Sequence, residues 1–106
     1  MRLDMIFKHP NGLDELNDRL VSNPRFIFYL YKDTGRDKRT RLSRLKGRYI
    51  WRHKRQGYNG VIKLIKDSGR FWVEIDDQSE GLLTGAFISW IIRNANDLVA
   101  GIDMRL

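Results

Sequence analysis

Apolar and polar residues alternate near the start of the chain, where Leu3, Met5 and Phe7 fall on one side of residues 2–8. A period of two is typical of a β-strand, and the turn-forming residues that follow would end it. The next residues instead carry leucines three and four positions apart. That spacing places them on one face and predicts a helix over about 12–21.

Residues 25–32 are mostly aromatic or aliphatic, a composition that favours a strand. Apolar side chains fall on both of its faces, which favours a central position in a sheet. Residues 102–106 alternate again and are consistent with a last strand.

A three-stranded meander is predicted over 48–77, with strands at about 48–58, 61–67 and 70–77. Two turn dipeptides, Asn59-Gly60 and Ser68-Gly69, separate the three runs. Asn-Gly is the strongest signal for a two-residue hairpin turn, because both positions must tolerate positive φ. The polar residues 52–56 cannot be buried in any register, so they are expected at a sheet edge or beyond the core.

The second turn fixes the register of the last two strands of the meander. The charges that this register places opposite each other provide a test of it. A two-residue loop pairs Asp67 with Arg70 and Lys63 with Glu74, which places opposite charges across from each other. The same register gathers the apolar side chains on one face: Ile62, Leu64, Phe71, Val73 and Ile75.

A long helix is predicted over about 80–99, begun by a capping-box spacing at Asp77 and Glu80 and ended by Gly101. It is apolar around almost its whole circumference. Two interpretations stay open: burial across the sheet with Gly85 allowing close approach, or a homodimer contact. The contact residues would be Phe87, Trp90 and Ile91.

These elements predict a single α+β domain over residues 1–106. Its sheet is largely antiparallel, and two helices pack on one face.

Charge is concentrated in one segment. The 106 residues carry a formal net charge of +7, yet residues 36–55 hold ten Lys and Arg against one acid, while the remainder holds ten against twelve. A basic segment of this kind is typical of a surface that binds polyanions.

We therefore expect the segment 36–55 to bind RNA or DNA without sequence selection. Arginine forks suit phosphate oxygens, and nearby aromatic rings can stack on unpaired bases. The expected contacts are Arg39, Arg41, Arg44, Lys46, Arg48, Trp51, Arg52, Lys54, Arg55 and Tyr58.

Two alternatives belong to other functional classes. One is a non-enzymatic homo-oligomeric accessory protein assembled through the helix at 80–99. The other is a small ribonuclease centred on His53, whose basic neighbours disfavour protonation and suit a catalytic base. We expect binding without catalysis to be the function, with His53 as the only catalytic candidate.

Several classes of site are excluded or disfavoured. The chain has no cysteine, so it forms no disulfide and uses no thiol chemistry. The acidic residues Glu74, Asp76, Asp77 and Glu80 have carboxylates suited to Mg²⁺ or Ca²⁺, but strand alternation splits them between faces. We predict no metal and no cofactor. Without an apolar signal core or a membrane-spanning run, a cytoplasmic protein with no membrane partner is expected.

Overall fold

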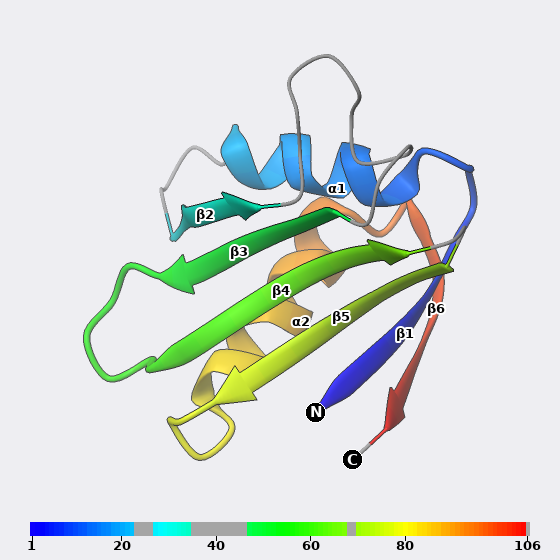
Figure 1. The fold of residues 1–106 in the computed structure, drawn as a ribbon. Coiled ribbons are helices and arrows are strands. Elements are labelled where there is room, and N and C mark those ends of the chain that lie inside the picture. The colour runs from blue at the N-terminus through cyan, green and yellow to red at the C-terminus, as the bar shows by residue number, and fades with distance from the viewer. Residues whose placement is uncertain (23–26, 35–46, 68–69, 106) are drawn as a thin grey trace.

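The described part of the chain folds into an α+β domain with one six-stranded sheet and two helices, as the sequence predicts (Figure 1). The computed structural model describes residues 1–22, 27–34, 47–67 and 70–105, and only the backbone of 30–34, 47 and 48. The elements in chain order are β1 (Arg2–Phe7), α1 (Gly12–Val21), β2 (Phe28–Thr34), β3 (Gly47–His53), β4 (Gly60–Asp67), β5 (Arg70–Asp77), α2 (Leu82–Asn94) and β6 (Val99–Arg105).

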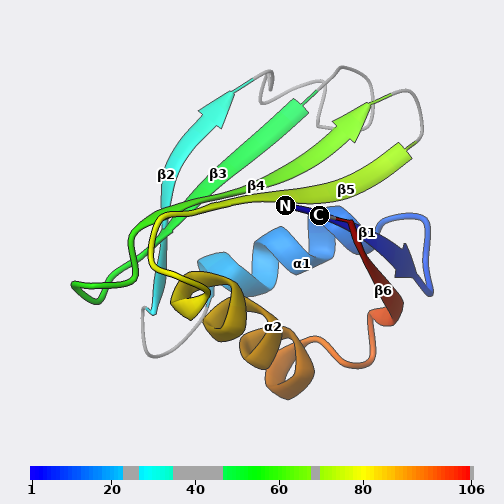
Figure 2. The same cartoon turned by 90° about the horizontal axis from the view of Figure 1, so that it is seen from below.

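The sheet has the strand order β2-β3-β4-β5-β1-β6, and every neighbouring pair is antiparallel. Both described helices lie against the same face of the sheet, and none of the residues that the structure describes forms a helix on the other face (Figure 2). The β1 strand lies between β5 and β6, so the two ends of the chain are brought side by side.

The core lies between the sheet and the helices. From α1 it receives the evenly spaced leucines Leu13, Leu16 and Leu20, all buried as expected. The inward face of the sheet supplies every second residue of its strands, because successive strand side chains point to opposite faces. Those residues include Leu3, Met5, Tyr49, Trp51, Ile62, Leu64, Val73 and Ile75.

The predicted register of the last hairpin is confirmed. Asp67 pairs with Arg70 and Lys63 pairs with Glu74. Three of the residues expected on the inward face of this hairpin are less than one per cent exposed: Ile62, Leu64 and Val73.

The first hairpin of the meander differs from its prediction. Strand β3 ends at His53 and β4 begins at Gly60, so the connection spans residues 54–59 and is not a two-residue Asn-Gly turn. Pairing of Trp51 with Ile62 sets this register, and the positive φ values fall on Gly57 and Gly60. Of the polar residues 52–56, Arg52 and His53 still belong to β3 and are half-buried, whereas 54–56 are exposed in the loop.

Strand β2 lies at an edge of the sheet, so the predicted central position is wrong. Of its strand residues with described side chains, Phe28 is 2 % exposed and Tyr29 is 45 % exposed, so one face is buried and the other is open. An edge strand needs one buried face only, which this alternation supplies.

The second helix is shorter than predicted. Glu80 and Gly81 have φ of 57° and 94°, which keeps both outside the helix. At the other end Asn94 is the last helical residue, and its side chain donates to the carbonyl oxygen of Trp90 at 3.0 Å. Gly101 does not cap the helix, because it pairs with Ile6 within the β1–β6 ladder.

The carboxylate of Asp77 caps this helix, but its partners are Thr84 and Ser79 and not Glu80 as the capping-box spacing predicts. One carboxylate oxygen accepts from the backbone N–H of Thr84 at 2.9 Å and from its hydroxyl at 2.7 Å. The other accepts from Ser79, whose own hydroxyl oxygen accepts from the Leu83 N–H at 2.9 Å. The first turn of α2 therefore has its backbone donors satisfied by Asp77 and Ser79.

Candidate nucleic-acid interface

A polar hollow of about 550 Å³ lies at the connection of β3 and β4. This connection is the loop on the left in Figure 1. It collects side chains from the edge strand β2, the end of β3, the connecting loop and the end of β5. Its lining residues are Tyr29, Arg52, His53, Lys54, Arg55, Gln56, Tyr58, Asn59, Gly60, Val61, Asp76 and Gln78. The hollow brings several basic and aromatic residues together.

The loop at 54–59 is held by backbone hydrogen bonds at both ends. The N–H of Lys54 donates to the Ile27 carbonyl at 2.7 Å, and the N–H of Gln78 donates to the Asn59 carbonyl at 3.0 Å. The loop is thereby attached to the edge strand and to the segment leading into α2. Its cationic side chains are presented from a fixed backbone.

Three predicted phosphate-binding residues surround this hollow. Lys54 and Arg55 are exposed in the loop, and Arg52 is half-buried on the sheet face that carries no helix. Arg55 lies 5.8 Å from the centre of the Tyr58 ring, and no carboxylate of the described residues forms an ion pair with it. One acid, Asp76, lines the same hollow, so the charge here is predominantly positive.

The imidazole of His53 is packed among aromatic rings. It stacks on Tyr58 with ring centres 4.3 Å apart and meets Phe28 edge-on at 5.1 Å. Its Nδ1 accepts a hydrogen bond from the backbone N–H of Arg55 at 2.9 Å. Burial, and secondly the charge of Arg55, lower the pKa of His53 below its ordinary value. The neutral ring therefore carries its proton on Nε2.

Trp51 cannot stack on a base, contrary to the expectation from sequence. It is 1 % exposed, and its indole N–H donates to Asn17 at 2.8 Å inside the core. Tyr58 remains partly exposed but already packs on His53 and Arg55. The sequence interpretation missed Tyr29, which is exposed at the rim of the hollow.

The remaining predicted contacts cannot be placed. Arg39, Arg41, Arg44 and Lys46 lie outside the described residues, and Arg48 lies in β3 with only its backbone described. The described ranges contain thirteen Lys and Arg against twelve Asp and Glu, and the other segments contain seven against one. Most of the net positive charge thus belongs to residues outside the description.

The three residues expected at a homodimer contact are core residues. Phe87, Trp90 and Ile91 are 0 %, 5 % and 2 % exposed. Burial across the sheet accounts for them, so their side chains offer no area to a second subunit. Gly85 is exposed with open space around it and does not mediate close approach to the sheet.

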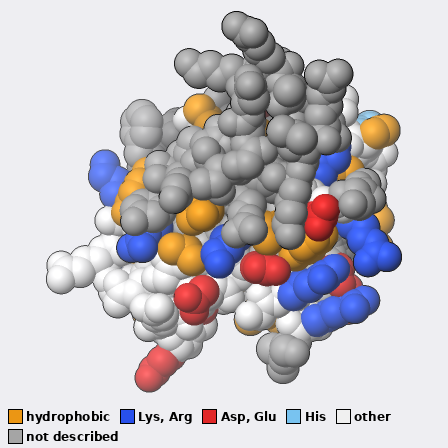
Figure 3. All heavy atoms as spheres, viewed as in Figure 1, with side chains coloured by type: hydrophobic (Ala, Val, Ile, Leu, Met, Phe, Trp, Pro, Cys, Tyr) orange, Lys and Arg blue, Asp and Glu red, His pale blue; other side chains and the backbone are white. Residues whose placement is uncertain are grey.

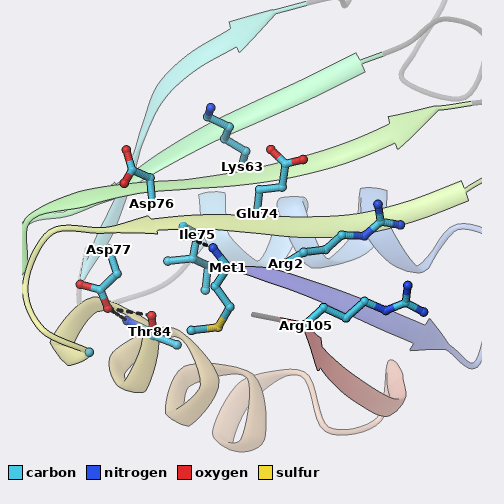
Figure 4. Close-up of a pocket in the computed structure, with 10 residues that line it drawn as sticks. Met1, Arg2, Lys63, Glu74, Ile75, Asp76, Asp77, Thr84 and Arg105 are labelled. Atoms are coloured by element: carbon cyan, nitrogen blue, oxygen red, sulfur yellow. Dashed lines mark hydrogen bonds between the residues drawn. The ribbon is translucent and has the colours of Figure 1, made fainter.

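A second hollow of about 760 Å³ lies where β1 begins beside β5 (Figure 4). Several of its charged groups have partners: the Met1 ammonium donates to the Ile75 carbonyl, and Asp77 accepts from Thr84. The guanidinium groups of Arg2 and Arg105 each form a 2.7 Å ion pair with Asp4. These internal pairs account for the groups that form them without a ligand.

The sheet face without helices shows Lys and Arg side chains beside Asp and Glu in the part drawn in colour (Figure 3). Among the residues described, no three His, Asp or Glu side chains gather as they would around a metal ion. None of the described helices combines the length and apolarity needed to span a bilayer.

Comparison of the chain with protein-family models, curated proteins and solved structures finds no match. Function is therefore inferred from the chain's own residues.

Proposed function

We propose that this protein binds RNA or DNA without base-sequence selection, through the cationic end of the β3–β4 hairpin. The observation that supports this is the grouping of Arg52, Lys54 and Arg55 around a polar hollow, while the other described residues carry ten Lys and Arg against twelve Asp and Glu. Arg39, Arg41, Arg44, Lys46 and Arg48 stay predicted contacts of the same kind.

Three other described arginines form ion pairs with carboxylates. Arg19 binds Asp97 through two hydrogen bonds of 2.6 and 2.7 Å, and Arg2 and Arg105 both pair with Asp4. Neutralised cations contribute little to phosphate binding. Arg55, in contrast, contacts an aromatic ring, a contact that leaves its positive charge uncompensated.

Titration of a labelled single strand of about 20 nucleotides over a salt series tests the proposal. The double variant Lys54→Ala/Arg55→Ala removes two phosphate contacts, so the slope of log affinity against log salt should fall by roughly one to two. The matched control Lys8→Ala/Arg93→Ala removes two exposed cations elsewhere. No binding at low salt, or an equal loss in the control, would refute the proposal.

A ribonuclease is the second candidate, because a neutral imidazole lies beside Tyr58 and Arg55 in the hollow. As a general base, however, His53 needs an open nitrogen lone pair, and Nδ1 already accepts from the Arg55 N–H. Cleavage would require that bond to open, whereas a neutral Nε2–H can donate to a phosphate oxygen directly. Unchanged RNA cleavage by His53→Ala would eliminate this role.

A further inference from the structure

We propose that the ligand is single-stranded nucleic acid and that Tyr29 is the ring on which an unpaired base stacks. This inference rests on the proposed function and specifies which form of nucleic acid the site takes.

Tyr29 has the position that such a platform requires. It lies on the edge strand β2, is 45 % exposed, and points to the sheet face that carries no helix. In the β2–β3 ladder its direct partner is Arg52, and both side chains line the hollow. An exposed ring beside a guanidinium can hold a base and its phosphate at neighbouring points.

The other aromatic side chains that the structure describes near the hollow are already buried or packed on neighbours. Trp51 and Phe28 are buried, and Tyr58 packs on His53 and Arg55. Among the residues that the structure describes, no aromatic ring or cationic group packs on the Tyr29 ring. Tyr29 is therefore the ring whose face can receive a ligand.

A stacking platform discriminates between nucleic-acid forms. In a duplex the bases are stacked on each other and paired, so a side chain on a sheet surface cannot reach a base face without unpairing it. In a single strand the face is accessible, and stacking adds affinity that does not depend on base identity. The Tyr29 contact should thus favour single strands while the cations contribute to both forms.

The experiment measures anisotropy of labelled single-stranded RNA, single-stranded DNA and duplex DNA, each of about 20 nucleotides, at one low salt concentration. We expect Tyr29→Ala to weaken binding of both single strands roughly five- to one-hundred-fold and to leave duplex binding nearly unchanged. Tyr29→Phe keeps the ring and should restore single-strand affinity. Thermal melting of each variant checks that the edge strand still folds.

The outcomes separate this inference from the proposed function. Single-strand affinity unaffected by Tyr29→Ala overturns the stacking role, even if Lys54→Ala/Arg55→Ala still lowers the salt slope. Tighter binding of the duplex than of the single strands by the wild-type protein also overturns it. So does an equal loss of affinity for an acidic polypeptide in Tyr29→Ala, because an acidic polypeptide has no base to stack. Failure of the proposed function appears instead as no binding to any of the three nucleic acids at low salt.

Discussion

The indole N–H of Trp51 donates a hydrogen bond to the side-chain oxygen of Asn17 across 2.8 Å, joining β3 to α1 inside the core. Trp51 is 1 % exposed and Asn17 is 3 % exposed, so water reaches neither group. A buried indole N–H needs an acceptor, and the helix supplies one from between its leucines. The bond also explains why a polar residue occupies the buried face of α1.

Replacing Asn17 should therefore destabilise the fold. Asn17→Leu leaves the indole N–H of Trp51 buried without a partner, which costs about 1–3 kcal/mol. Urea unfolding followed by tryptophan fluorescence measures the change. Asp18→Ala, at the exposed neighbouring position, is the control and should shift the midpoint little. Equal midpoints for wild type and Asn17→Leu would show that the bond contributes nothing.

Substitution by alanine should change the stability of the fold in opposite directions at two glycines. At Gly60, φ is +125° and an added Cβ would lie 2.0 Å from the Asp76 carbonyl oxygen. Gly60→Ala should cost more than about 2 kcal/mol or prevent folding, because backbone cannot move aside cheaply. At Gly85 nothing lies within 4 Å, and the residue is helical. Gly85→Ala should stabilise by about 0.5–1 kcal/mol.

Thermal melting of both variants checks this pair. A higher melting temperature for Gly85→Ala confirms that the exposed face of α2 has no neighbour at this position. A loss of stability there would mean that the glycine is needed for packing. Gly60→Ala melting like wild type would contradict the close approach of β4 to the end of β5.

Local patterns predicted most of the fold because they depend on neighbouring residues. The β4–β5 register followed from a two-residue turn and from charges that face each other, as with Lys63 and Glu74. The order of strands did not follow, because no local pattern states that β1 lies between β5 and β6. The Asn59-Gly60 signal failed since the pairing of Trp51 with Ile62 places the turn earlier.

The basic residues of the candidate site could be predicted from the sequence, but its exposed aromatic side chain could not. Arg52, Lys54 and Arg55 were identified because they belong to a run of polar residues, 52–56, that no strand register can bury. Trp51 was misassigned because its face depends on partners in β4, whose register with β3 was not known. Tyr29 was overlooked since it lies in an apolar run, where one exposed ring cannot be recognised until the strand is placed at an edge.

Asp77 should make the stability of the fold sensitive to acid. Its burial alone would raise the pKa, but hydrogen bonds from Ser79 and Thr84 outweigh it and hold the pKa of Asp77 well below its usual range. A depressed folded-state pKa gives stability that is present above about pH 4, the unfolded value, and is lost as pH falls towards the folded value.

Urea unfolding at pH 7 and at about pH 3 measures the effect. We expect Asp77→Ala to be less stable than wild type at pH 7 by about 0.5–2 kcal/mol, as for other lost helix caps, and the gap to narrow in acid. The hydrogen bond from Arg19 lowers the pKa of Asp97 to about 2. Asp97 contributes equally to the pH dependence of wild type and of Asp77→Ala, so it cancels from the difference in stability between them. Asp76→Asn, at the exposed neighbour, serves as the control. A gap that is constant with pH would contradict the role of the ionised cap.

His53 should titrate below its ordinary value of about 6.5, because burial and the charge of Arg55 both disfavour the imidazolium. Protonation would also turn Nδ1 into a donor and break its bond from the Arg55 N–H. The unfolded chain therefore binds the proton more readily, and stability should decline as pH falls below about 6.5 until the folded value is passed. Proton NMR of the imidazole resonances measures the titration, with His53→Gln assigning the signal against His9. A His53 midpoint at or above 6.5 would contradict the geometry, whereas Arg55→Ala should move the midpoint upward.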